Sequence, residues 1–253
     1  MRGALAEKGF GAEKDFRWRG RDVSRIENLS DAVFGFSLTL LVVSLEVPAT
    51  FTALMDVVRG FAAFAVCFTL LLVLWHSHYV FFRRYGLNDS FTIVANSALL
   101  FLVLFYVYPL KFIFTYLIGS LCASAGLFGQ EARGAYLQRL NAMVTEESAV
   151  PLMAIYGAGF LAVSLVFAWL YAHAWKKRAE LELDAVETHM TVEEMQGHLL
   201  DAGVATLSIA IALAGRPGLA GWSYFLVGPA RAAHGMWMRK RRAELPRATA
   251  AAS

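Results

Sequence analysis

Charge is scarce in this chain. Only 17% of its 253 residues are Asp, Glu, Lys or Arg, whereas 58% are hydrophobic. Because soluble domains average about 25% charged residues, this composition excludes an ordinary soluble domain and indicates a membrane protein. The net charge of +3 is too small to support binding to nucleic acid. The two cysteines, Cys67 and Cys122, have neither metal-ligand nor disulfide spacing, so we expect both to be small buried apolar residues.

Sequence patterns of enzymes are also missing. There is no glycine-rich phosphate loop and no Ser/His/Asp arrangement, so the sequence does not predict an enzyme. Metal-ligand spacing is also missing among His173, His189, His198 and His234. We therefore predict no metal site and no cofactor. Residues 1–24 lack the apolar core and small-residue cleavage site of a signal peptide. We therefore interpret them as a cytoplasmic N-terminal segment.

Long apolar runs are what the chain has in abundance. A helix that crosses a bilayer needs about 20 mostly apolar residues, and six candidate runs can be read. They predict an all-α, polytopic protein with six transmembrane helices inside a domain of residues 25–242. We expect a loop at 119–150, a charged cytoplasmic helical extension at 176–198 and a cytoplasmic tail at 243–253. The six expected spans are 32–47, 57–82, 90–118, 151–175, 199–213 and 219–238.

The basic residues predict how these spans are oriented. Seventeen of the 23 Lys and Arg residues fall in four segments that six spans would place on one side. The positive-inside rule then predicts a multi-pass protein of the cell membrane with both termini in the cytoplasm. The four segments are 1–31, 83–84, 176–178 and 239–247.

Polar residues cluster near one end of the first three spans. Arg25 and Asp31 begin the first, Trp75 and His78 end the second, and Asn96 lies early in the third. Since the predicted topology brings these ends to a similar depth, we expect Arg25, Asp31, His78 and Asn96 to form a charge-assisted network. Two interpretations remain open: the network only locks three helices together, or it has a catalytic or proton-handling role.

The apolar half of the first span raises a second question. At about 100° per residue, Phe36, Leu40 and Val43 share one face, and Thr39 borders it. The stripe fits ordinary helix packing, but it also fits a pore in which identical first helices meet and form a hydrophobic constriction. The hydroxyls of Ser37 and Thr39 are tolerated because each can bond the carbonyl one turn earlier. Periodicity does not decide between these interpretations.

Several motifs in the first 115 residues favour the pore over ordinary helix packing. Arg25-x-x-x-Leu29-Ser30-Asp31, followed by Ser37–Leu41 and Val47-Pro48, resembles the first helix of the transmembrane protein 175 family of potassium channels. The second and third spans resemble those of the same family over residues up to about 115. The residues that carry this second resemblance are Trp75-x-x-His78 with Phe81, Asn96, and Tyr108-Pro109.

The resemblance implies a potassium-selective cation channel, with K⁺ as the permeant ion and no cofactor. The first-helix motif occurs once, which resembles the prokaryotic form that assembles as a homotetramer in the bilayer, with the first helices lining the pore. Like that family, the chain lacks a Thr-Val-Gly-Tyr-Gly filter. The constriction then maps to Phe36, Leu40 and Val43, and a threonine beside the pore maps to Thr39. A supporting polar network maps to Arg25, Ser30, Asp31, Trp75, His78 and Asn96.

The chain departs from the family pattern at two positions. Leu29 stands where the motif has Phe, and Phe36 stands where the first pore layer has Ile or Leu. An alternative of a different class is a proton-coupled secondary transporter that uses Asp31 and His78 as a relay. Transporters commonly have internal repeats and helices broken at the bilayer midplane, and the sequence has no evident sign of either.

Overall fold

The computed structural model describes residues 16–20, 22–43, 48–126 and 130–245, and over these residues its regular structure is entirely helical. The predicted all-α class is confirmed. The helices, in chain order, are α2 (Arg25–Val43), α3 (Phe51–Tyr85), α4 (Ser90–Ser124), α5 (Gln130–Met143), α6 (Glu146–Lys176), α7 (Ala185–Leu213), α8 (Pro217–Ser223), the 3₁₀ turn η1 (Tyr224–Leu226) and α9 (Val227–Ala243).

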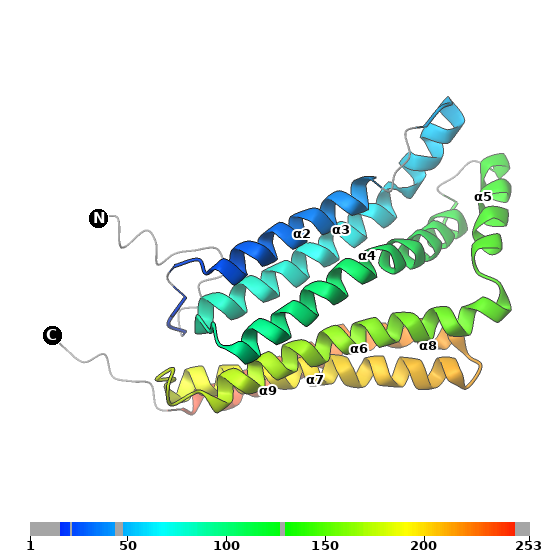
Figure 1. The fold of residues 1–253 in the computed structure, drawn as a ribbon. Helices are drawn as coiled ribbons and strands as arrows, with labels where there is room; N and C mark the ends of the chain where they lie inside the picture. The colour runs from blue at the N-terminus through cyan, green and yellow to red at the C-terminus, as the bar shows by residue number, and fades with distance from the viewer. Residues whose placement is uncertain (1–15, 21, 44–47, 127–129, 246–253) are drawn as a thin grey trace.

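The long helices form two groups that meet along one seam. Figure 1 shows α2, α3 and α4 side by side, with α6, α7 and α9 below them and α5 crossing the far end. The contact between the groups is made mainly by α4 and α6. The largest core cluster contains Phe81, Phe82, Leu99, Phe167 and Leu170, which come from α3, α4 and α6. Burial of apolar side chains therefore continues across the seam.

Five helices are long and apolar enough to cross a membrane: α2, the 60–85 part of α3, α4, α6 and α7. The sixth expected span, 219–238, is not one helix. It consists of α8, η1 and α9, and these three pieces together run back along α7 (Figure 1). Gly228 and Pro229 lie in the first turn of α9, directly after the 3₁₀ turn. A proline fits there because the first turn of a helix has no intrahelical partner for its N–H.

One expectation about the connections was wrong. Residues 119–150 are mostly helix rather than loop, because α4 continues to Ser124 and α5 and α6 occupy most of the rest. The expected helical extension at 176–198 falls in two elements. A turn follows Lys176, and Asp184 then caps α7 by accepting a hydrogen bond from the backbone N–H of Glu187, so residues 185–198 are the first half of α7.

The seam between α4 and α6 contains an unusually close approach. A Cβ atom on Gly159 would overlap Cε1 of Tyr106, so only glycine leaves room for that ring. The Tyr106 hydroxyl donates a hydrogen bond to the carbonyl of Ile155, 3.2 Å away. One aromatic side chain of α4 is thus seated in a notch on α6.

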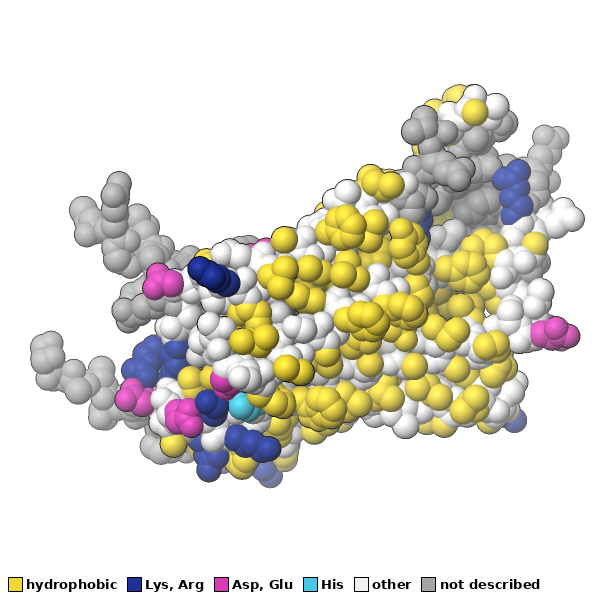
Figure 2. Space-filling model, viewed as in Figure 1, with side chains coloured by type: hydrophobic (Ala, Val, Ile, Leu, Met, Phe, Trp, Pro, Cys, Tyr) yellow, Lys and Arg dark blue, Asp and Glu magenta, His cyan; other side chains and the backbone are white. Residues whose placement is uncertain are grey.

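The basic segments gather at one end of the molecule. The start of α2, the α3–α4 turn, the α6–α7 turn and the end of α9 all lie at the left of Figure 1. Figure 2 shows dark blue side chains concentrated at this end, while yellow side chains cover most of the remaining face. We call it the basic end, and it contains Arg83, Arg84, Lys176 and Arg239–Arg242 among the described residues.

Candidate pore-lining helix

The first helix begins with a reciprocal cap. The backbone N–H of Ser24 donates to Glu27 Oε1 at 2.9 Å, and the N–H of Glu27 donates to Ser24 Oγ at 3.3 Å. This capping box satisfies N–H groups that have no intrahelical partner in a first turn. It fixes where α2 starts and explains why its polar beginning, from Arg25 to Asp31, is helical.

One side of α2 packs tightly inside the chain. Ile26, Ser30, Phe34, Ser37 and Leu41 recur at intervals of three or four residues and are all buried. This spacing follows from 3.6 residues per turn, which keeps them on one face. The face packs against α3 and α4. Leu41 has no exposed surface, so this side of the helix has no room for an additional partner.

A chain of hydrogen bonds crosses the buried side. Ser30 donates to the carbonyl of Ile26 at 2.8 Å and accepts from the Asn96 amide nitrogen at 3.0 Å. Asn96 Oδ1 must then accept from His78 Nε2, 2.8 Å away, because the Asn96 amide nitrogen faces Ser30. Protons therefore point from α3 through α4 into α2. The chain ends on a backbone carbonyl, which gives it the form of a helix-locking contact.

The other members of the expected network lie apart from the Ser30–Asn96–His78 hydrogen bonds. The indole Nε1–H of Trp75 donates to Asp31 Oδ1 at 2.8 Å, which joins α2 to α3. Arg25 is exposed, and its side chain makes no hydrogen bond or ion pair within the part of the chain that the structure describes. Within one subunit, the structure thus brings together Ser30, His78 and Asn96, and separately Asp31 and Trp75, but it does not bring Arg25 to either group.

The opposite side of α2 is uncovered. Ten of its 19 residues are exposed, and on a helical wheel of about 100° per residue they form one continuous arc. Phe36 is 55% exposed and Val43 69%, and Thr39 lies near the centre of the arc. Leu40 lies at its margin and packs partly against the core of its own subunit. The exposed residues are Arg25, Asn28, Leu29, Asp31, Ala32, Gly35, Phe36, Thr39, Val42 and Val43; we call them the α2 arc.

The hydroxyl groups of α2 bond as the sequence predicts. Ser37 donates to the carbonyl of Val33 at 2.8 Å, and Thr39 donates to that of Gly35 at 3.0 Å. Their surroundings differ, because Ser37 is buried and Thr39 is exposed. Since the Thr39 proton is committed to Gly35, the lone pairs of its oxygen remain available to a cation or a water molecule on the arc.

Known proteins that are similar to this chain show its family. The family model described as "Endosomal/lysosomal potassium channel TMEM175" matches residues 25–106, from the start of α2 into α4. A protein of Marivirga tractuosa named "Potassium channel" is 38% identical over 88% of this chain and 90% of its own length. The chain belongs to the TMEM175 family of potassium channels. The resemblance inferred from its motifs is confirmed.

Two further potassium channels are similar to this chain. A potassium channel of Chamaesiphon minutus is 28% identical over 60% of this chain and 66% of its own length. A crystal structure of a threonine-to-alanine variant of the potassium channel MtTMEM175, in complex with a nanobody–MBP fusion, is 35% identical. It covers 91% of this chain and all of the solved chain with a TM-score of 0.79. The family is one of ion channels, not of enzymes.

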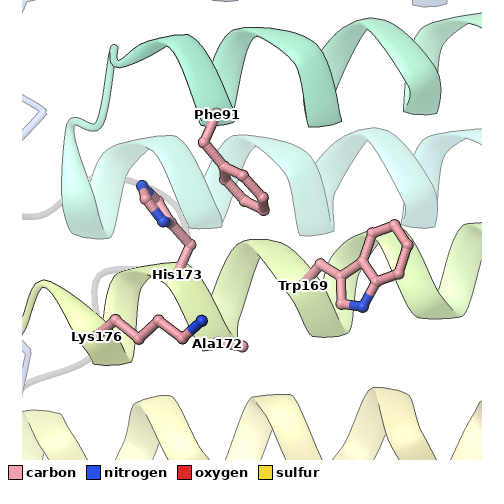
Figure 3. Close-up of a pocket in the computed structure, with 5 residues that line it drawn as sticks. All are labelled: Phe91, Trp169, Ala172, His173 and Lys176. Carbon is pink, nitrogen blue, oxygen red and sulfur yellow. The ribbon is translucent and has the colours of Figure 1, made fainter.

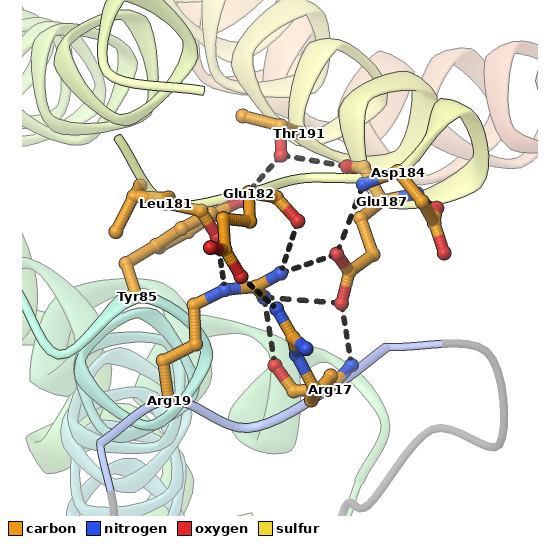
Figure 4. A network of polar contacts seen from close by, with 8 residues as sticks. All are labelled: Arg17, Arg19, Tyr85, Leu181, Glu182, Asp184, Glu187 and Thr191. Carbon is orange, nitrogen blue, oxygen red and sulfur yellow. Dashed lines mark hydrogen bonds and ion pairs between the residues drawn. The ribbon is translucent and has the colours of Figure 1, made fainter. Parts of the chain in front are cut away.

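A short arm before α2 was not anticipated as part of the TMEM175 fold. Phe16 is buried against Tyr85, and residues Phe16–Gly20 lie against the end of α3 and the start of α7. Figure 4 shows Arg19 between the carbonyl of Leu181, 2.6 Å from its Nε, and the carboxylate of Glu187. The backbone N–H of Arg17 donates to Glu187 Oε1 at 2.7 Å. Residues 16–20 are not helical, but they are packed against α3 and α7 as part of the folded chain.

Sequence signals for the missed residues were present in part. The Ser24-x-x-Glu27 spacing is that of a capping box, so Glu27 could have been recognised. Arg19 and Glu187 are 168 residues apart, and nothing in their local sequence pairs them. No group of three or more His, Cys, Asp or Glu side chains that could hold a metal ion occurs among the described residues.

Proposed function

We propose that four copies of this chain assemble around a central axis, with the α2 arc of each copy lining a path for K⁺. The observation that carries this proposal is the contrast between the two sides of α2: one is fully packed, and the other exposes polar, small and apolar residues together. Ala32, Gly35 and Thr39 are small enough to let identical helices approach closely. A purely lipid-facing surface has no need of Thr39 at its centre.

The hydrophobic constriction follows from that arrangement. Phe36 and Val43 lie on the exposed arc, so four copies of each would form apolar rings that exclude water and present ions with a desolvation barrier. Leu40 would contribute less, because part of its surface packs inside its own subunit. Thr39 lies between these rings along the helix, and its oxygen would replace part of the water that K⁺ gives up.

The polar groups beneath the arc, together with Asp31 on it, would keep the first helix in place. The Ser30–Asn96–His78 chain and the Asp31–Trp75 bond attach α2 to α4 and α3. Arg25 would take its partner from a neighbouring subunit or from lipid. We further propose the cell membrane as location, with the basic end and both termini in the cytoplasm, as the positive-inside rule favours.

Ion flux into liposomes tests the proposal. We expect K⁺-driven flux in the wild type and a several-fold larger flux in Phe36→Ala, because the apolar ring is removed. Phe225→Ala is a matched control: Phe225 is 72% exposed but lies in η1, and its truncation should leave flux unchanged. Native mass spectrometry should give the mass of four subunits for all three proteins.

Two outcomes would contradict the proposal. Equal fluxes in Phe36→Ala and the wild type would remove Phe36 from the ion path. Saturable uptake coupled to protons and abolished by Asp31→Asn would instead support a secondary transporter.

A further inference from the structure

A cavity lies at the basic end, away from the α2 arc. Its volume is about 360 Å³, and it is lined by five residues of α4 and α6. Figure 3 shows Phe91 pointing from α4 toward α6, where the other side chains lie along almost two turns. We call it the α4–α6 pocket, and its residues are Phe91, Trp169, Ala172, His173 and Lys176. A volume of this size suits a small ligand or part of a larger one.

The wall of the pocket at the end of the molecule is polar and rigid. Asp89 caps α4 by accepting the N–H of Thr92 at 2.9 Å, and its Oδ2 lies 2.7 Å from His173 Nε2 and 3.1 Å from Lys177 Nζ. The Phe91 ring stacks on His173 with centroids 4.4 Å apart. Lys177 also pairs with Glu180, 3.0 Å from its Nζ, so the Asp89 carboxylate is held by His173 and by a lysine that it shares with a second carboxylate.

Lys176, at the rim of the pocket, differs from Lys177 in its surroundings. Lys176 is exposed, and among the residues that the structure describes none is recorded within ion-pair distance of its ammonium group. In Figure 3 its side chain runs along α6 toward Ala172, at the edge of the pocket. Among the described residues, the mouth of the pocket therefore carries a positive charge that is in no ion pair, next to the cluster of Asp89, Lys177 and Glu180.

The other end of the pocket is apolar. Trp169 is 60% exposed and lies seven residues before Lys176, about 10 Å further along α6 toward the apolar part of the span. Val94 and Phe101 of α4 continue the exposed apolar surface beyond Phe91. Tryptophan is enriched at the level of lipid headgroups. Positive charge, aromatic walls and apolar surface thus follow one another in the order of the phosphate, glycerol and acyl parts of a phospholipid.

We propose that the α4–α6 pocket binds one anionic phospholipid from the leaflet at the basic end. The lipid phosphate pairs with Lys176, the glycerol backbone lies between Phe91 and Trp169, and an acyl chain follows the exposed apolar side of α4. Anionic lipids are enriched in the cytoplasmic leaflet, the side where the proposed orientation puts this end. The site does not involve the α2 arc, so it stands or falls separately from the ion path.

Tryptophan quenching by brominated lipid measures binding at this pocket. The purified full-length protein is reconstituted with brominated phosphatidylglycerol or brominated phosphatidylcholine, and Trp169→Phe defines the fraction of the quenching that comes from Trp169. We expect stronger quenching of Trp169 by phosphatidylglycerol. Lys176→Gln should lower that preference about fivefold, which is the size expected for one basic side chain at an anionic surface, and Lys176→Arg should retain it.

A second lysine separates a site from general attraction. Lys240 is also exposed and lies on α9 at the basic end, so Lys240→Gln removes the same charge away from the pocket. We expect it to leave the quenching of Trp169 unchanged, and soluble glycerol phosphate should not displace the brominated lipid.

Four results would overturn the proposal. Equal losses in Lys176→Gln and Lys240→Gln would reduce the effect to surface charge. Equal quenching by both lipids would remove the requirement for an anionic headgroup. Displacement by glycerol phosphate would identify a free phosphate site. A change in subunit number with Lys176→Gln, seen by native mass spectrometry, would make the pocket a contact between subunits.

Discussion

Helices α2 and α7 begin in the same way and end in different environments. Each starts with a capping box, and each buries polar side chains. From Val186 to His198, however, no residue of α7 is exposed, whereas ten of the 19 residues of α2 are. The reason is that α7 packs against α6, α8 and α9, most extensively against α6, while α2 packs mainly against α3 and α4.

The difference shows where the chain needs something outside itself. The buried charges of α7 find partners within the subunit: Glu187 binds Arg19, and Asp201 accepts hydrogen bonds from Arg231 at 2.6 and 3.1 Å. On the α2 arc, Arg25 has no recorded partner among the described residues. A helix that leaves half of its surface and one of its charges uncovered in this way is typical of one that is completed by assembly.

The largest expected effect comes from breaking the enclosed charge pair of α7. Arg231→Leu leaves the Asp201 carboxylate buried without its cation, and removal of one partner from such a pair typically costs about 3–5 kcal/mol. We expect a large fall in the thermal unfolding temperature, measured by fluorescence in detergent. Arg239→Leu, at the exposed end of α9, is the control and should change it little. Similar values for the two variants would show that the enclosure of α7 has no energetic importance.

The next effect concerns the packed side of α2. Asn96→Leu removes the amide that joins His78 to Ser30 and leaves two buried groups with a lost partner, at about 1–3 kcal/mol each. We expect lower thermal stability and loss of the assembled species in size-exclusion chromatography. Ser97→Ala, one residue along and exposed, should have almost no effect. A fully assembled Asn96→Leu protein would mean that the hydrogen bonds through Asn96 do not hold α2 in place.

A matched pair of substitutions compares the two sides of α2 directly. Ser37→Val adds volume to the buried side, and overpacking of this kind costs about 1–3 kcal/mol. Thr39→Val keeps the shape on the exposed side and should change stability by less than about 0.5 kcal/mol, but it removes the oxygen that faces the proposed path. We therefore expect reduced stability with unchanged K⁺ over Na⁺ preference for Ser37→Val and the opposite for Thr39→Val. Unfolding temperature and liposome flux with each cation measure both properties, and a reversed pattern would exchange the roles of the two sides.

The smallest effect depends on pH. Burial alone raises the pKa of Asp89, but hydrogen bonds from His173, the Thr92 backbone and Lys177 outweigh it and hold the pKa well below its ordinary value. The stability from this ionised carboxyl is thus complete above the ordinary value, about 3.9, and is lost as the pH falls toward the lowered one. Asp89→Asn should reduce the unfolding temperature slightly at pH 7, and the difference from the wild type should shrink below about pH 4. A constant difference across this range would exclude ionisation as the cause.

Local sequence was sufficient for most of the fold. The apolar runs predict α2, α3, α4 and α6, because the need for about 20 apolar residues is a property of each segment by itself. It was insufficient for residues 219–238, where a 3₁₀ turn interrupts the run. It was also insufficient for α5, whose residues are too polar and too few to suggest a membrane span.

The candidate site was predictable to a similar degree. His78 and Asn96, which meet through neighbouring spans at one depth, could be grouped from topology, whereas Ser30 entered the expected network only through the family resemblance. The separation of Asp31 from His78 could not, because it depends on side-chain direction and on the competing indole of Trp75. The position of Leu40 at the margin of the arc likewise depends on how α2 is rotated against α3 and α4, which packing decides and periodicity does not.

The notch at Gly159 bears on how such a molecule can move. The Tyr106 ring fills space that any side chain at 159 would occupy, so sliding or twisting of the α2–α4 group against the α6–α9 group would first have to withdraw a whole aromatic ring. Each subunit is therefore pinned against internal shear at this point. In the proposed assembly of four copies, dilation of the central passage would then come from tilting of whole subunits relative to one another, with the boundaries between copies as the compliant joints.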